Sequence, residues 1–189
     1  YTTFVKERLA TLWEIYHTGG TLQADYQLKR LLASNKVITV QPYASEALCV
    51  SYQLQGSLYR DMMKFDDAHI FYEKAFEIAR ALNDIELMSA TLARRGVTCI
   101  QQNTAMAALE YLNEAYTLIK DRPLPYLSGY ILQAFSEAYA IAQKPYESEQ
   151  HIDMAQQALL ARGKYPERSH CQANTTSVIA QKGVNAVHL

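Results

Sequence analysis

Small residues and tyrosines recur at a fixed interval along this chain. The first copy of the pattern, within the stretch 49–80, contains Gly56, Tyr59, Ala68, Tyr72 and Ala75. Forty positions later the small residues return as Gly96, Ala108 and Ala115, and a third copy keeps Tyr139 and Ala155. A fixed period of this size indicates a stacked array of structural repeats, in which each unit packs mainly on its neighbours.

The residue types within one copy indicate two short antiparallel helices that pack closely. Ala68, Tyr72 and Ala75 are three or four positions apart, which places them on one face of a helix. Small side chains let two helix backbones approach each other, while aromatic rings fill the space beside them. We therefore expect each copy to form a helical hairpin.

The pattern resembles the tetratricopeptide repeat (TPR). In the first copy the residues that match the family's positions are Tyr52, Gly56, Tyr59, Ala68, Tyr72 and Ala75, with Phe65 in the turn. The corresponding positions hold Leu92, Gly96, Cys99, Ala108, Leu112 and Ala115 in the second copy, and Ser136, Tyr139, Ser148, Ile152 and Ala155 in the third. The usual repeat has about 34 residues, whereas Gly56 and Gly96 are 40 positions apart. Lengthened repeats of this kind are similar to those in helical domains of bacterial helix-turn-helix transcriptional regulators.

The resemblance implies an all-α fold, a TPR-like α-solenoid of antiparallel helical hairpins with about nine helices in a right-handed superhelix. We expect one domain over residues 1–189 that consists of a degenerate first hairpin (1–34), three repeats (43–82, 85–120 and 126–162) and a capping helix (166–182). The strand-like stretch 37–40 precedes Pro42 and is predicted to be an extended linker. Because the chain begins in mid-pattern without Met, we expect it to be a fragment of a longer protein.

Composition and charge narrow the classes of function. Hydrophobic residues make up 49% of the chain, which is ample for a continuous core. The formal net charge of −1 argues against nucleic-acid binding by this segment. No run approaches the roughly 18 apolar residues of a membrane span. The widely spaced cysteines Cys49, Cys99 and Cys171 are typical of free thiols in a reducing compartment, so we expect a cytoplasmic protein.

Signatures of catalysis and of metal binding are absent from the sequence. There is no nucleophile elbow, no phosphate-binding glycine-rich loop and no dinucleotide fingerprint. His170 and Cys171 are adjacent and would point about 100° apart on a helix, which makes them a poor chelate. We therefore predict that the segment is not an enzyme and that it uses neither a metal nor another cofactor.

A binding surface is the better hypothesis for function. In the family that this chain resembles, the first helix of each hairpin lines a concave groove. By helical spacing, the inward-facing positions are Val50, Gln53, Ser57, Arg60, Ala90, Ala93, Val97, Ile100, Tyr130, Gln133, Glu137 and Ala140. The carboxylate clamp of chaperone-binding members is missing, because Gln53, Ser57, Ala93 and Val97 stand in its places. The alternative is that these residues are solvated or pack against the terminal helix.

The sequence leaves two functional hypotheses open. The first is a protein- or peptide-binding module that forms the sensing or oligomerising part of a bacterial transcriptional regulator. The second is a stand-alone interaction scaffold with no ligand switch. A homodimer is compatible with both, because Tyr43, Tyr111, Tyr116 and Tyr165 lie outside the repeat pattern and tyrosine is favoured at interfaces.

Overall fold

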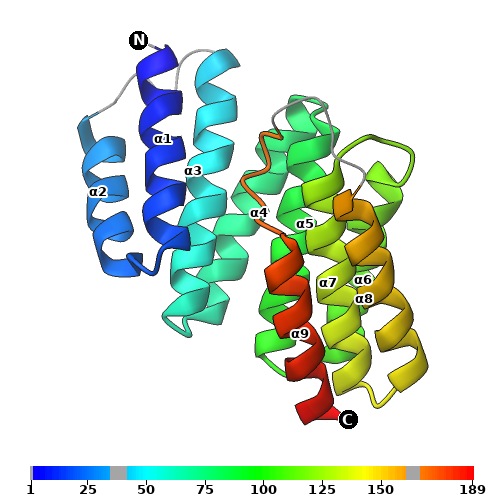
Figure 1. Ribbon diagram of the computed structural model, residues 1–189. Helices are drawn as coiled ribbons and strands as arrows, with labels where there is room; N and C mark the ends of the chain where they lie inside the picture. The colour runs from blue at the N-terminus through cyan, green and yellow to red at the C-terminus, as the bar shows by residue number, and fades with distance from the viewer. Residues whose placement is uncertain (1, 35–41, 161–166) are drawn as a thin grey trace. The chain divides into compact units, whose positions relative to one another are not determined.

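The computed structural model describes residues 2–34, 42–160 and 167–189 (Figure 1). Over these ranges it contains nine helices and no strand, so the protein has an all-α fold of the helical-repeat solenoid class. The helices are α1 (Thr2–His17), α2 (Thr21–Ser34), α3 (Pro42–Asp61), α4 (Phe65–Ala81), α5 (Ile85–Gln101), α6 (Ala105–Ile119), α7 (Pro125–Ile141), α8 (Pro145–Leu160) and α9 (Thr175–His188). The chain divides into two compact units, Tyr1–Met88 and Ser89–Leu189, with the boundary inside α5.

The helices of the three central hairpins begin and end within two residues of the positions expected from the repeat pattern. The stretch 37–40, predicted to be a linker, lies outside the described residues, as do residues 161 and 162 of the third repeat. The structure corrects the expected capping helix over 166–182. Residues 167–174 are not helical, and the last helix, α9, runs from Thr175 to His188.

The shifted start of α9 has a local cause in its N-cap. The Asn174 side chain accepts a hydrogen bond from the backbone N–H of Ser177 (2.8 Å), and the Ser177 hydroxyl accepts one from the backbone N–H of Asn174 (3.0 Å). This reciprocal capping box satisfies two amides that a helix terminus otherwise leaves without a partner. A helix that began at residue 166 would place Asn174 in its interior, where asparagine is less favourable.

The turns that close the hairpins repeat with the sequence. Met63, Asn103 and Gln143 follow α3, α5 and α7 at intervals of 40 residues, and all three have a left-handed backbone with φ of 58–59°. After each one, the next amide donates to the carbonyl five residues back, as in the 2.9 Å bond from Lys64 N to Tyr59 O. These are Schellman turns, which satisfy the last carbonyls of a helix.

Contacts between the paired helices repeat at the same interval. Cys49 on α3 donates to the Ala75 carbonyl on α4 (3.2 Å), and forty positions on, Ser89 on α5 donates to the Ala115 carbonyl on α6 (2.8 Å). Gly56 lies against the Tyr72 ring, and Gly96 lies in the same way against Leu112. The period of 40 residues is therefore a structural repeat as well as a sequence repeat.

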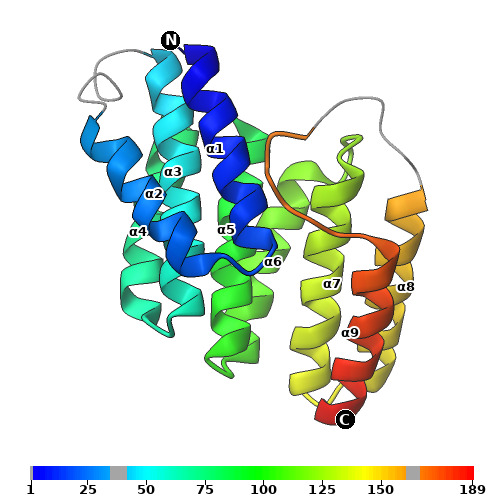
Figure 2. The same cartoon turned by 60° about the vertical axis from the view of Figure 1, so that its left-hand side comes forward.

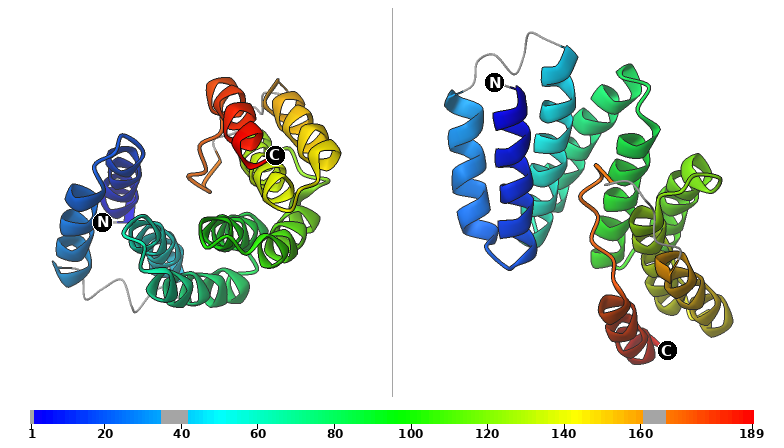
Figure 3. Two further views of the ribbon diagram at one scale, coloured as in Figure 1. Left: turned by 90° about the horizontal axis from the view of Figure 1, so that it is seen from below. Right: turned by 45° about the horizontal axis from the view of Figure 1, so that its top comes forward.

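Each unit has its own buried core. In the first unit Leu9, Trp13, Leu28, Leu54 and Leu58 belong to a single cluster formed by α1, α2 and α3 (Figure 2). In the second unit Leu132, Ile152, Ala155 and Val178 form a cluster where α9 packs against α7 and α8 (Figure 3). Within the described residues, no helix combines the length and apolar composition needed to cross a bilayer.

Candidate functional site

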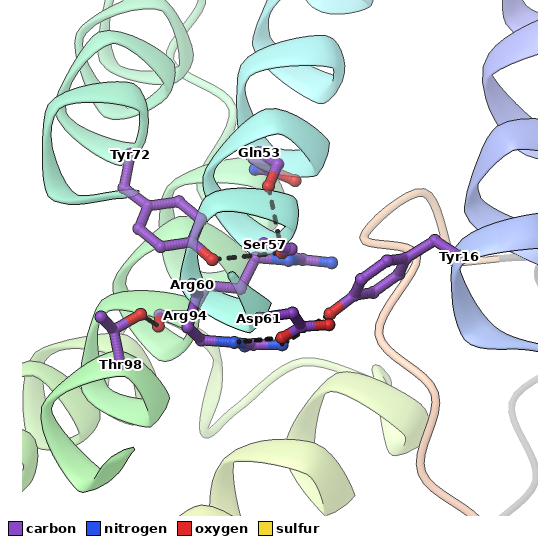
Figure 4. A network of polar contacts seen from close by, with 8 residues as sticks. All are labelled: Tyr16, Gln53, Ser57, Arg60, Asp61, Tyr72, Arg94 and Thr98. Atoms are coloured by element: carbon purple, nitrogen blue, oxygen red, sulfur yellow. Dashed lines mark hydrogen bonds and ion pairs between the residues drawn. The ribbon is translucent and has the colours of Figure 1, made fainter. Parts of the chain in front are cut away.

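The inward positions predicted on α3 are occupied by contacts inside the first unit. Gln53 is fully buried and donates from Nε2 to the Leu87 carbonyl (3.1 Å). Ser57 is 1% exposed, and its hydroxyl shares a hydrogen bond of 3.1 Å with the Tyr72 hydroxyl (Figure 4). Val50 is also buried. The α3 side chains that we expected to contact a ligand are thus buried, with Ser57 bonded to α4 of its own hairpin and Gln53 bonded to Leu87 at the start of α5.

Arg60, the fourth predicted position on α3, is buried as well. Its guanidinium donates to the Tyr16 hydroxyl on α1 (2.6 Å) and pairs with the Asp61 carboxylate (3.0 Å), as Figure 4 shows. A buried arginine is stable only when its donors are satisfied. These contacts assign Arg60 to the junction between α1 and α3.

The predicted positions on α5 are also mostly internal. Ala90 and Ala93 are fully buried, Ile100 is 5% exposed and Val97 is partly buried. One position beyond Ala93 lies Arg94, which the groove prediction did not include. Its side chain is only 2% exposed, although a guanidinium normally reaches solvent.

On α7 the predicted side chains face α9. Gln133 donates from Nε2 to Gln181 Oε1 (3.2 Å), and its own Oε1 accepts from the Ser177 hydroxyl (3.1 Å). Burial raises the pKa of the Glu137 carboxyl above its ordinary value, while His188 and a hydrogen bond with Gln181 act in the opposite direction. The alternative that these positions pack against the terminal helix therefore holds for Gln133 and Glu137. Tyr130 is partly buried and Ala140 is fully buried.

The interface between α9 and the last hairpin contains a polar network beside the apolar cluster around Val178. Asn185, which is 5% exposed, donates to the hydroxyls of Ser136 on α7 and Ser148 on α8, the latter at 3.1 Å. Gln181 donates to Asn185 Oδ1 (3.0 Å) and so extends the same network along α9. Ser136 and Ser148 stand where the first hairpin has Gly56 and Ala68, so the third repeat uses its small-residue places to hold α9.

Residues 167–174, which we call the strap, are held against the second unit before α9 begins. The Glu167 carboxylate accepts hydrogen bonds from the first-turn amides of α7, at Tyr126 N (2.7 Å) and Leu127 N (2.7 Å). Arg94 donates to the Ser169 carbonyl (2.8 Å) and also to the Ala90 carbonyl of its own helix (3.2 Å). The strap is the irregular orange segment that leads into α9 in Figures 1 and 2.

Burial alternates along the strap. Ser169, Cys171 and Ala173 are 0%, 7% and 2% exposed, while Arg168 and Gln172 are exposed. Ala173 lies near Gly129 of α7, where a Cβ built on the glycine would be 3.4 Å from the Ala173 Cβ. The strap is non-helical with bends at residues 168 and 169, and its side chains at every second position are buried against the second unit. The left-handed backbone of His170 (φ 50°) makes a bend between the two halves.

Sequence reasoning did not identify Arg94, Glu167 or the strap as a site. The signal that could have found them is the alternation of small residues at 169, 171 and 173, which has a period of two and not the helical period. Asn174 followed by Thr, Thr and Ser is also a helix-start pattern. The expectation of a helix from residue 166 concealed both signals.

The remaining candidates for a site are a surface hollow, groups of metal-binding side chains and the cysteines. A hollow of about 770 Å³ lies between α1 and α2 and is lined in part by Phe4, Arg8, Tyr26 and Arg30. The described ranges contain no group of three or more His, Cys, Asp or Glu side chains placed to hold a metal ion. Cys49, Cys99 and Cys171 are buried free thiols, and burial raises the pKa of the Cys99 thiol.

Two of the four tyrosines considered for a dimer surface have partners within the second unit. Tyr111 accepts a hydrogen bond from Arg95 (2.9 Å), whose guanidinium lies 4.5 Å from the ring centre. Tyr116 meets Phe135 edge-on. The side chains of Tyr43 and Tyr165 lie outside the described part of the chain.

Comparison with known proteins adds no family to this description. No model of a protein family matches the chain, and no curated protein matches it.

Proposed function

We propose that the chain is a protein- or peptide-binding module built from lengthened tetratricopeptide-type repeats. The observation that supports this most directly is the strap, a non-helical piece of polypeptide held on α5 and α7. Arg94 reaches its backbone carbonyl at Ser169, and α7 offers two amides to its carboxylate at Glu167. Groups of this kind recognise a peptide through its backbone and one charged side chain.

The repeat contacts support the choice of family. The hydrogen bonds from Cys49 and Ser89, the glycine contacts at Gly56 and Gly96, and the Schellman turns all return every 40 residues. Arrays of stacked hairpins serve mainly as extended binding surfaces, because their helices present successive faces to a partner. The sequence shows no catalytic signature, so the module binds without chemistry.

The wider role that fits this module is the sensing or oligomerising part of a bacterial cytoplasmic transcriptional regulator. This rests on the resemblance of the 40-residue repeats, with the DNA-binding part outside this sequence. The alternative is an interaction scaffold without a ligand switch. A sensor changes its stability or its oligomeric state when it binds a small peptide, whereas a scaffold binds one folded partner and does neither.

The test is selection from a displayed library of random peptides on the full chain, followed by thermal unfolding with each selected peptide. A peptide that binds only the folded state stabilises it by about 2.7 kcal/mol at 100 times its Kd. We expect at least one selected peptide to raise the Tm in a saturable manner. Native mass spectrometry with and without that peptide then separates sensor from scaffold by a change from monomer to dimer. Selection that yields no binder would refute the proposal.

A further inference from the structure

We infer that the strap occupies a peptide-binding site on the second unit, and that the site's ligand is a bent, non-helical peptide with an acidic residue followed at alternate positions by small residues. The inference rests on the proposed function and names the chemistry of the ligand. In the strap these residues are Glu167, Ser169, Cys171 and Ala173. The chain's own segment therefore competes with any external ligand.

The first determinant is the acidic side chain. Both Glu167 oxygens accept from consecutive amides at the start of α7, each at 2.7 Å. The positive end of the helix dipole lies at the same place, so the arrangement favours a carboxylate over a neutral amide. A glutamine at the ligand position can present only one oxygen and would put N–H groups opposite the other backbone amide.

The second determinant is the buried guanidinium of Arg94. It donates to the Ser169 carbonyl of the strap, and a hydrogen bond of this kind recognises polypeptide backbone whatever the side chain. Displacement of the strap would take this acceptor away from Arg94, so a hydrogen bond from a charged donor is lost unless water or another carbonyl replaces it. A second peptide that supplies a carbonyl at this point restores the bond.

The third determinant is the size of the inward-facing side chains. Ser169 and Ala173 are buried, and Ala173 lies near Gly129 of α7. Larger side chains at these two positions would need space that their buried surroundings already fill. Gln172 is exposed and does not contribute to this selection.

The occupancy of the site by the chain itself has a quantitative consequence. A segment attached to its own binding surface acts at an effective concentration in the millimolar range for short connections. An external peptide of equal intrinsic affinity therefore binds only weakly until the strap is weakened. The strap thus sets a threshold for the ligand concentration.

The test uses two fluorescein-labelled probes, both kept reduced. One is the octapeptide with the sequence of residues 167–174, and the other carries Gln in place of its Glu. Binding is measured by fluorescence anisotropy to the full chain and to three full-length variants. One variant has residues 167–173 replaced by glycine and serine with Asn174 kept, the second is Glu167→Gln, and the control is Gln172→Ala at an exposed position of the strap.

We expect the glycine–serine variant to bind the acidic probe at least tenfold more tightly than the native chain does. Glu167→Gln should give an intermediate gain and Gln172→Ala none. The Gln probe should bind about tenfold more weakly, since hydrogen bonds to a charged group are the stronger kind. If the glycine–serine variant loses helicity, the comparison of Glu167→Gln with Gln172→Ala decides the question.

The possible outcomes separate the inference from the proposed function. If peptides from the random library bind the native chain and the strap variants equally well, and the acidic probe shows no preference for the variants, the module binds peptides elsewhere and the inference is overturned. Equal binding of the acidic probe by Glu167→Gln and Gln172→Ala would also overturn it. If neither the library nor the probe yields binding to any form, the proposed function fails, and the inference with it.

Discussion

The close contact between Gly56 and Tyr72 makes a quantitative prediction for the substitution Gly56→Ala. A Cβ at residue 56 would lie 2.5 Å from Tyr72 Cε1, whereas ordinary contacts begin at 3.4 Å. The ring would have to move by about 0.9 Å, the difference between these two distances. Tyr72 is fully buried and its hydroxyl is hydrogen-bonded to Ser57 at 3.1 Å, so it has little freedom to move.

Opposing terms set the expected size of the effect. Overpacking of a core costs about 1–3 kcal/mol, and weakening of the hydrogen bond between Tyr72 and Ser57 adds about 1 kcal/mol. Replacement of a helical glycine by alanine returns about 1 kcal/mol through helix propensity. We expect Gly56→Ala to lower the free energy of unfolding by about 1–3 kcal/mol.

The matched control is Gly183→Ala on α9. A Cβ there would meet no atom within 4 Å, so only the propensity term applies. We expect this variant to be more stable by about 0.5–1 kcal/mol. Urea unfolding followed by far-UV circular dichroism measures both variants against the native chain.

A double-mutant cycle completes the experiment. In a Tyr72→Ala background the ring is gone, so Gly56→Ala should become neutral or stabilising. If Gly56→Ala stabilises the native chain as much as Gly183→Ala does, the two helices are not as close as the structure shows. The argument from close packing would then fail.

Three further predictions concern single positions. Met63→Gly should stabilise the protein by about 0.5–1 kcal/mol in urea unfolding, because the left-handed turn suits glycine, whereas Met63→Ala should bring no gain. Gln53→Ala should lower the free energy of unfolding by about 1–3 kcal/mol, because a buried hydrogen bond is lost. A variant that binds a ligand differently but unfolds like the native chain would contradict the buried, structural role of Gln53. The raised pKa of Glu137 means that the folded state holds its proton more tightly. The stabilisation by the protonated Glu137 carboxyl is complete below the unfolded pKa of about 4.3, and it is lost as pH rises through the higher folded pKa. Glu137→Gln should therefore gain stability relative to the native chain across that pH interval. A pH series of Tm measures this, and a Tm difference between the two proteins that does not change with pH would refute the prediction.

Much of the fold was predictable from the repeat because its determinants are local. Glycines and alanines in fixed places specify where two helices approach, and the starts expected for the three central hairpins (43, 85 and 126) lie within one residue of those observed. The start of α9 was not predicted, because the expected capping helix over 166–182 took no account of the capping signal at Asn174.

The candidate site was harder to predict than the fold. Helical spacing correctly places Gln53, Ser57 and Arg60 near one side of α3, but spacing does not say what covers that side. In this protein neighbouring elements of the same unit cover it, as the bonds to Leu87 and Tyr16 show. Similarly, Arg94 acquires its role from a residue 75 positions away, a distance over which pattern analysis of a single sequence has no information.

The amide and hydroxyl network beneath α9 also determines how the end of the chain responds to temperature. Apolar interfaces weaken on cooling, because exposure of apolar surface carries a large positive heat capacity, while exposure of polar surface carries a small negative one. The contacts of Asn185 with Ser136 and Ser148, and of Gln133 with Gln181, belong to the second kind. These polar contacts offset part of the heat-capacity change that the apolar cluster around Val178 contributes at the same interface. In a calorimeter, release of α9 should therefore change the baseline by less than the buried apolar area around Val178 alone would predict.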